Sequence, residues 1–269
     1  RGKCAGPCRL PYELLNHNNV SNKETTMDKG YLLSPKDLCT LDYLPQLIDA
    51  GVKCFKIEGR LKSPEYVATV TRIYRKYIDK ILNKEDYIVE DSDMKQLLQI
   101  FNRGGFSSGH LSDSPNKNLI FKERPNNIGL FLGNISKFSS NKGHITLTLN
   151  EDLAIGDTIY TEKEDSKYTV SELMQKTLNL THAKAGTRVT IGRMKGNISV
   201  GDKVYKLNSK ELLNTARLSY TNCENKKINI NANVIVKKRI PISISVNYNN
   251  SVISVSSDVV PIPAINSPI

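Results

Sequence analysis

The first third of the chain carries apolar residues at helical spacing. The run Ser34-Pro35-Lys36-Asp37 predicts a helix start, because Ser is a good N-cap, Pro fits the first helical position and an acid suits the first turn. Five apolar residues follow at that spacing: Leu38, Leu41, Leu44, Leu47 and Ile48. Pro45 predicts a break within this helix, and Gly51 predicts its end.

A strand and a second helix follow. Residues 52–57 predict a short strand, which leads at once into the polar turn Glu58-Gly59-Arg60. Ser63-Pro64-Glu65 begins the next helix by the same logic, with one apolar stripe at positions 66, 67, 70, 73, 74, 77, 78 and 81. Helix, strand, polar loop and helix form the repeat of a parallel α/β fold, for which a barrel and a doubly wound sheet would both fit.

The later part of the chain has a β pattern. Residues 94–101 predict a helix, 102–109 a Gly-rich loop, and 115–125 a linker rich in Asn, Lys and Pro. From residue 128 onward, apolar and β-branched runs at 128–132, 145–149 and 189–191 predict strands. The pattern of residues 153–160 recurs at 198–205, each time with a Gly-Asp pair that makes a tight turn before a strand. These features predict a small closed antiparallel barrel.

We therefore divide the chain into four segments. They are residues 1–84 with the α/β pattern, 85–125 with a helix, a Gly-rich loop and a linker, 126–207 with the small β-barrel, and 208–269 with a short helix and the start of a third β domain. The chain begins at Arg1 without Met or a targeting signal and stops just after a strand-like run. We interpret it as an internal piece of a longer protein.

Composition narrows the class of protein. Of 269 residues, 39% are hydrophobic and 24% are charged, and no window approaches the roughly 18 uncharged apolar residues of a membrane span. Five cysteines are too few and too irregularly spaced for a secreted disulfide scaffold, which favours a reducing, cytoplasmic compartment. The net charge of +11 favours a polyanionic partner such as RNA, although a general enrichment of the chain in Lys explains this charge as well.

Cysteines are the first candidates for chemistry. Cys4 and Cys8 form a Cys-x3-Cys pair, and Cys39 follows in an apolar run, so these thiols are either buried or part of a metal site. The Cys-x3-Cys-x2-Cys motif of radical enzymes is excluded, because its third cysteine would stand at position 11, which is Pro. We expect Cys54 and Cys223 to be structural. An iron–sulfur cluster needs four thiolates, and this segment supplies at most three.

The turn after the predicted strand is the second candidate. In a parallel α/β fold the site lies beyond the carboxyl ends of the strands, where Glu58 and Arg60 are expected. An Arg at this place suits a carboxylate or a phosphate, because its guanidinium offers parallel donors. The alternative is a surface pair that only shapes the turn.

The other polar patterns are less specific. The exposed side of the 63–82 helix carries Arg72, Arg75, Lys76, Lys80 and Lys84, which form either a solvated face or an RNA contact. Four histidines, His17, His110, His144 and His182, have no metal spacing to one another. The common nucleotide, hydrolase and zinc motifs are absent from the sequence.

Three stretches carry a family resemblance. Residues 1–12 (RGKCAGPCRLPY), 30–41 (GYLLSPKDLCTL) and 52–70 (VKCFKIEGRLKSPEYVATV) resemble the collagenase-like peptidase family U-32, and Phe101-Asn-Arg103-Gly-Gly-Phe106 is similar to a loop of that family. The resemblance is nearly continuous over residues 1–110. The segment at 126–207 and the one after it look like accessory domains of the longer members, which are similar to the enzyme that hydroxylates a cytidine of 23S ribosomal RNA.

The resemblance implies a fold, a cofactor and a substrate. Residues 1–84 would be the later part of a TIM-like barrel, before a small antiparallel β-barrel that resembles those of translation factors. Relatives are oxygen-independent hydroxylases with a [4Fe–4S] cluster on four cysteines, and the RNA-modifying ones draw on prephenate. By motif position Cys4 and Cys39 match two cluster ligands, Cys8 is a further candidate ligand, and the remaining two would precede Arg1.

Three functions remain in competition. The first is an iron–sulfur-dependent hydroxylase of 23S rRNA or tRNA, with Glu58 and Arg60 as catalytic residues and no membrane partner. Residues 126–269 support it, because their 18 basic and 11 acidic side chains give them the larger basic excess. The second is a peptidase, for which this stretch supplies no convincing nucleophile and base. The third is a non-catalytic module that binds RNA or the ribosome.

Overall fold

The structure is a computed structural model that describes residues 5–17, 24–111, 119–163, 166–221 and 227–263. The chain divides into two compact units, Arg1–Thr221 and Asn222–Ile269. The second unit is a three-stranded antiparallel sheet of β16 (Asn231–Lys237), β17 (Ile240–Tyr248) and β18 (Ser251–Ser256), at the strands predicted for the third β domain. No helix among the described residues is long and apolar enough to span a bilayer.

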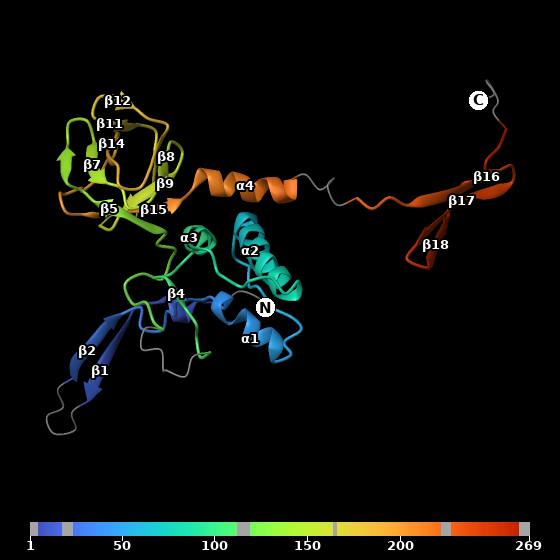
Figure 1. Cartoon of the computed structure of the whole chain (residues 1–269), viewed down its shortest axis with the longest axis horizontal. Coiled ribbons are helices and arrows are strands. Elements are labelled where there is room, and N and C mark those ends of the chain that lie inside the picture. Colours follow the sequence, from blue (N-terminus) through green and yellow to red (C-terminus); the bar gives the residue numbers. More distant parts are fainter. Residues whose placement is uncertain (1–4, 18–23, 112–118, 164–165, 222–226, 264–269) are drawn as a thin grey trace. The chain divides into compact units, whose positions relative to one another are not determined.

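Helix α2 (Pro64–Leu82) confirms the strongest helix prediction (Figure 1). The Ser63 hydroxyl accepts a hydrogen bond from the Tyr66 backbone N–H at 3.3 Å, and Pro64 occupies the first turn, as the sequence predicts. The apolar stripe buries Val70, Ile73 and Tyr77. This face packs against α3 (Asp91–Ile100), which confirms the helix predicted at residues 94–101, with its start three residues earlier.

The helix predicted from Ser34 is wrong in its first half. Asp37–Leu38 is strand β3, which pairs in parallel with β4 (Phe106–Ser107). Helical structure begins only with the 3-10 turn η2 (Leu41–Tyr43) and α1 (Leu44–Asp49), where Pro45 lies in the first turn. The reason is a long-range contact: Asp37 binds Arg103 instead of capping a helix. Gly51 ends the helix with φ of +91°, as predicted.

The strand predicted at residues 52–57 does not form. The segment is extended, but no described strand pairs with it, and Val52, Lys53 and Cys54 are exposed. A strand needs a neighbour to satisfy its backbone groups. In the described residues the parallel pairing is limited to β3 and β4, so the TIM-like barrel expected for residues 1–84 is not confirmed. Instead the fold is mixed α/β with several separate sheets.

Near the N-terminus, β1 (Tyr12–His17) and β2 (Glu24–Gly30) form an unpredicted antiparallel hairpin that follows the short 3-10 helix η1 (Pro7–Arg9).

The small β part contains two antiparallel sheets over one core. One sheet has the order β10-β9-β15-β5 and the other β12-β11-β14-β7-β6, with β13 and β8 as a separate pair. The strands are β5 (Leu130–Asn134), β6 (Lys137–Ser139), β7 (His144–Thr148), β8 (Leu153–Ala154), β9 (Thr158–Thr161), β10 (Tyr168–Thr169), β11 (Leu173–Gln175), β12 (Leu178–Asn179), β13 (His182–Ala183), β14 (Arg188–Ile191) and β15 (Lys203–Asn208). The shared core includes Leu132, Ile145, Leu147, Ile159 and Val204.

The closed barrel predicted here is corrected to two open sheets. The predicted strands at 128–132, 145–149 and 189–191 correspond to β5, β7 and β14, but no strand pair joins the two sheets among the described residues. The edge strands β10 and β12 have two residues each, which is too short for a ladder that would close the gap.

The repeated Gly-Asp turns do share one geometry. Gly156 and Gly201 have φ of +92° and +94°, a conformation that favours glycine. The Asp157 carboxylate accepts from the Ala154 N–H at 3.0 Å, and the Asp202 carboxylate accepts from the Ser199 N–H at 2.8 Å. The two turns lead into β9 and β15, which pair with each other.

Hydrogen bonds attach α3 to the small β part, and α2 to the helix that follows the small β part. The Gln99 amide of α3 donates to the Lys206 carbonyl of β15 at 2.9 Å. Glu65 of α2, which is 8% exposed, accepts from Arg217 at 2.7 Å and Tyr220 at 3.1 Å, both on α4 (Lys210–Thr221). The hydrogen bond from Arg217 is the main reason why the pKa of Glu65 is lowered to about 2.

We expect the Glu65 contact to make stability depend on pH in acid. Because its pKa is lower in the folded chain, its contribution is complete above the unfolded value of about 4.3 and is lost as the pH falls toward 2. Glu65→Gln should lower the free energy of unfolding at pH 7 by about 1.5 kcal/mol and flatten the acid limb. Urea unfolding between pH 2 and pH 7 measures both effects. The exposed Glu85→Gln variant should keep the wild-type slope, and an equal slope in all three proteins would contradict the assignment.

Candidate functional site

A cavity of about 470 Å³ lies between α2, α3 and the segments that precede and follow them. Its apolar wall is formed by Leu47, Phe55, Ile57, Val70, Leu97, Phe101 and Phe106. Its polar wall is formed by Asp37, Cys39, Thr40, Glu58, Lys62, Tyr66, Tyr74 and Arg103. A larger cavity of about 720 Å³ next to α3 and α4 contains none of the residues predicted as catalytic or as ligands. We call the smaller one the Cys39 cavity.

The Asp37–Arg103 pair holds two walls of the Cys39 cavity together. The Arg103 guanidinium donates to both Asp37 carboxylate oxygens, from Nε at 3.2 Å and also from Nη2. The Arg103 backbone N–H adds a fourth hydrogen bond at 2.9 Å. Both side chains are less than one fifth exposed, at 18% and 17%. This bidentate geometry fixes β3 against the loop after α3.

Two further cations share the space around Asp37. Arg9 donates to the Ser34 hydroxyl at 2.5 Å and to the Pro35 carbonyl at 3.4 Å. Burial, and after it the charge of Arg103, lowers the pKa of Arg9. Arg9, Lys62 and Arg103 thus share one carboxylate, Asp37, within electrostatic reach.

Among Arg9, Lys62 and Arg103, Lys62 is the residue whose side chain has no hydrogen-bond acceptor or carboxylate partner within the described residues. Burial, and after it the charge of Arg103, lowers its pKa to about 8, and the charge of Asp37 only partly opposes this. The ammonium lies over the Phe101 ring and 5.5 Å from the Tyr66 ring centroid. Within the described part of the chain, no carboxylate or other acceptor lies within bonding distance of Lys62. A half-buried ammonium with this environment is suited to an anionic ligand.

Cys39 lies in the same cavity as a neutral thiol. Its backbone N–H donates to the Ser107 carbonyl at 3.0 Å, and the Tyr74 hydroxyl donates to its sulfur at 3.8 Å. Burial raises the pKa of the Cys39 thiol. Burial and the neighbouring Cys39 raise the pKa of Tyr74 to about 12, so the tyrosine is not a base for the thiol at neutral pH. The described residues therefore give Cys39 no activation as a nucleophile.

The structure places only one of the two residues predicted as catalytic at the Cys39 cavity. Glu58 lines the Cys39 cavity, whereas Arg60 is exposed and does not line it. The Glu58 carboxylate accepts from the Arg60 backbone N–H at 3.1 Å and lies 3.9 Å from the Lys56 ammonium. These contacts shape the turn, and the catalytic roles of both residues stay predictions.

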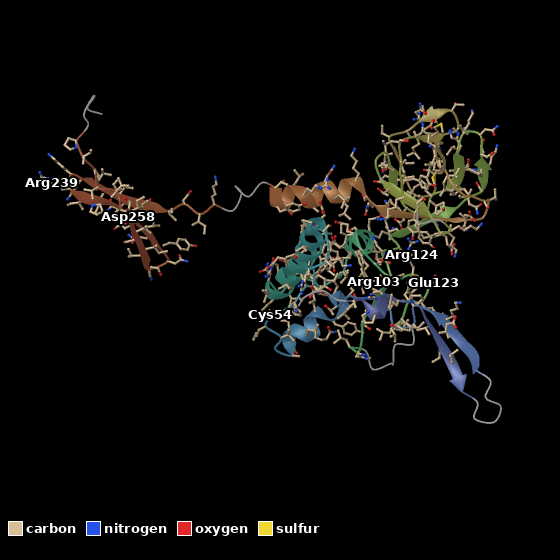
Figure 2. All side chains as sticks on the ribbon, turned by 180° about the vertical axis from the view of Figure 1, so that it is seen from behind. Cys54, Arg103, Glu123, Arg124, Arg239 and Asp258 are labelled. Carbon is tan, nitrogen blue, oxygen red and sulfur yellow. The ribbon has the colours of Figure 1, made fainter. Side chains whose placement is uncertain are left out.

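The predicted metal ligands are described only in part. Cys4 lies outside the described residues, as does Cys223, so the distance from Cys4 to Cys39 stays untested. Cys8 is half-buried in η1. Cys54 lines the Cys39 cavity as an exposed thiol (labelled in Figure 2) and is not part of a core. In the described ranges, no three His, Cys, Asp or Glu side chains lie close enough to hold a metal ion. These residues do not complete a cubane site, which needs four thiolates.

The basic face of α2 forms contacts within the chain. Arg75 pairs with Asp79, Lys76 with Glu90 and Asp93 at 2.7 Å each, and Lys80 with Glu90 at 3.5 Å. Arg72 donates to the Gln96 side chain at 2.6 Å. The arrangement favours a structural role for this face over RNA contact. His110 is exposed in its loop.

Sequence reasoning missed Lys62, Asp37 and Tyr74 as site residues. The pattern around Asp37 predicts a helix start, and Lys62 lies in the turn before the second helix, where nothing in the sequence distinguishes it from an exposed lysine. Arg103 carried a visible signal, because it precedes the Gly104-Gly105 pair of a loop that lies next to the cavity wall.

Comparisons with known proteins agree on one family. Residues 1–120 match the family model described as Peptidase family U32. An uncharacterized protease of Methanocaldococcus jannaschii is 33% identical over 77% of this chain and 52% of its own length, and a collagenase of Porphyromonas gingivalis is 29% identical over 78% and 52%. The 23S rRNA 5-hydroxycytidine C2501 synthase of Escherichia coli is 33% identical over 58% of this chain and 24% of its own. Shorter matches are to tRNA hydroxylation proteins. The chain spans about half the length of the first two relatives.

We expect Arg103→Gln to destabilise the first unit. The change leaves the Asp37 carboxylate with too few donors in a mostly buried place, which should cost about 2–3 kcal/mol in the free energy of unfolding. Urea denaturation followed by circular dichroism measures this loss. Arg75→Gln is the matched control, because its partner Asp79 is about half exposed, and it should leave the urea midpoint unchanged. Equal midpoints for both variants would contradict a structural role for the Asp37–Arg103 pair.

Proposed function

We propose that this chain, whose residues 1–120 belong to peptidase family U32, is part of an enzyme that hydroxylates a base of ribosomal or transfer RNA. The activity would belong to the longer protein, because the chain spans about half of its curated relatives. Relatives named for hydroxylation of 23S rRNA and tRNA support this substrate class. In the longer protein, residues 1–84 would contribute to a TIM-like barrel.

The unpaired ammonium of Lys62 in the Cys39 cavity carries the proposal. A hydroxylase of this kind uses a small carboxylic acid as co-substrate, and prephenate is the candidate that the family resemblance implies. Lys62 and Arg103 would bind the carboxylate by charge-assisted hydrogen bonds. The rings of Phe101 and Phe106 would pack against the carbon skeleton. Peptide hydrolysis needs no such anion site.

The iron–sulfur cluster is proposed only through the individual cysteines that would bind it. Cys39 and Cys4 would be two ligands of a [4Fe–4S] cluster, with Cys8 as a further candidate. The described residues do not complete this site, so we derive no step through a cluster. What these residues do is bind and orient: Tyr74 fixes the Cys39 sulfur, and Asp37 fixes Arg103.

The peptidase alternative rests on the name of the family model and on relatives named as a protease and as collagenases. A cysteine peptidase needs a thiolate with a neighbouring base. The thiol in the Cys39 cavity has a raised pKa and a tyrosine hydroxyl as its neighbour, and no histidine among the described residues lines the cavity. These observations favour the hydroxylase over the peptidase.

The test uses the full-length protein purified without oxygen. Incubation with RNA, a carboxylate co-substrate and an added two-electron acceptor should convert one base C–H bond to C–OH, detected by mass spectrometry of the digested RNA. With water as the source of oxygen, this step releases two protons and passes two electrons to the acceptor. The protein should also show the visible absorbance of a cluster. Cleavage of gelatin by metal-free protein, without RNA oxidation, would favour the peptidase. RNA binding without either reaction would favour a non-catalytic module.

Variants distinguish the two candidate anion sites. Lys62→Gln should raise KM for the carboxylate about 10- to 100-fold, because it removes a charge-assisted hydrogen bond worth about 1.5–3 kcal/mol. Lys53→Gln is the matched control, since Lys53 is exposed on the same segment and does not line the cavity, and its KM should stay unchanged. If Arg60→Gln raises KM and Lys62→Gln does not, the anion site lies at the turn and this assignment is wrong.

A further inference from the structure

Three aromatic rings form a row across the sheet β10-β9-β15-β5. Tyr205 of β15 lies directly opposite Phe131 of β5 and Tyr160 of β9 in the strand register, which places all three on one face. The Tyr205 and Tyr160 rings are stacked, with centroids 5.3 Å apart and an angle of 15°, and Phe131 meets Tyr205 edge-on at 5.6 Å. The Arg124 guanidinium lies 4.6 Å from the Tyr160 ring centroid.

This row borders two neighbouring hollows. One, of about 350 Å³, is lined by the rings of Tyr31, Phe121, Tyr160 and Tyr205 together with Arg124 and Asn126. The other, of about 520 Å³, shares Arg124, Asn126 and Tyr160 and adds Lys167, Asn127 and Asn208. Shared lining residues make them one continuous feature, which we call the aromatic groove. It is separate from the Cys39 cavity, with which it shares no lining residue.

We propose that the aromatic groove binds unstacked bases of a single-stranded RNA segment. Bases stack on aromatic rings and on guanidinium planes. Tyr160 is only 3% exposed and Phe131 is not among the residues that line the groove, so the half-buried rings of Tyr31, Phe121 and Tyr205 offer the stacking surface. The amides of Asn126 and Asn208 supply both donors and acceptors for base edges, whereas the Asn127 amide oxygen already accepts from two backbone N–H groups. The ligand class rests on the proposed function, although binding can be measured without catalysis.

The charge of the groove favours RNA over a proline-rich peptide, which is the other class of ligand that binds in aromatic-lined grooves. Aromatic-lined grooves also dock proline-rich peptides, which carry no fixed charge. Here Arg124 and Lys167 line the groove, and the chain as a whole has a net charge of +11. The two carboxylates at the rim do not cancel this, because Glu162 pairs with Lys203 at 3.3 Å and only Glu123 remains.

The groove lies next to the loop that carries Arg103. Phe121 lines the groove and packs on Gly104, where a Cβ atom would lie 2.2 Å from the ring. Gly104 follows Arg103, which lines the Cys39 cavity. Figure 2 shows Arg103, Glu123 and Arg124 in the same region of the first unit. One strand of RNA held in the groove would thus lie beside the cavity where the reaction is proposed.

The test is RNA binding by the chain as it stands. Fluorescence anisotropy with a labelled single-stranded oligoribonucleotide of mixed sequence should give salt-dependent binding. Tyr205→Leu and Tyr31→Leu, which replace two half-buried rings of the groove, should each weaken it about 5- to 150-fold, the range expected for one lost base–aromatic contact. Tyr205→Phe keeps the ring and should bind within about twofold of the wild type, which separates stacking from misfolding. Tyr248→Leu, a change of a 44% exposed ring in the second unit, is the matched control and should bind as the wild type does.

The outcomes separate this proposal from the proposed function. Wild-type affinity in both Tyr205→Leu and Tyr31→Leu, or no RNA binding by the wild type, would overturn the groove assignment. Binding of a labelled proline-rich peptide in place of RNA would also overturn it. RNA binding that depends on the groove, in a full-length protein that oxidises no base, would refute the hydroxylase and leave the groove assignment standing.

Discussion

The ion pair between Asp37 and Arg103 is the contact on which the candidate site depends. The two residues are 66 positions apart, and four hydrogen bonds join them. They bring β3 beside β4, and the backbone bond from Cys39 to Ser107 continues that pairing. Cys39 and Phe106 both line the cavity, so the pair stabilises two of its walls.

The same contact explains why the cavity is prepared for an anion. Among the described residues, Asp37 is the one carboxylate that acts on Arg103, Lys62 and Arg9 together, so it compensates their positive charges only in part. Burial is the main cause that lowers the pKa of Lys62. A small carboxylate would reduce the remaining positive charge while its carbon skeleton meets the aromatic wall. The cavity chemistry is thus consistent with the proposal that the names of the RNA-hydroxylating relatives support.

Local signals in the sequence predicted those elements that local interactions determine. The cap at Ser63, the stripe of α2 and the two Gly-Asp turns depend on residues within a few positions of each other, and the structure contains all of them. Ser34 carried the same local signal as Ser63, but the distant partner of Asp37 decides that segment. Residues 52–57 have a strand pattern and no described neighbour, so the parallel barrel inferred from them is not confirmed. Lys62 could not be identified beforehand, because its burial and its lack of an acceptor result from the fold.

The central claim is that Lys62 holds a small carboxylate in the Cys39 cavity. The most direct measurement is the pKa of Lys62 from ¹³C-labelled lysine by NMR, assigned with Lys62→Arg, without and with phenylpyruvate as a probe. We predict a value of about 8 in the free chain and a higher value with the probe, because a bound anion stabilises the ammonium form. A free-chain pKa at the ordinary value of about 10.4, or one that does not change while the probe binds, would contradict the account.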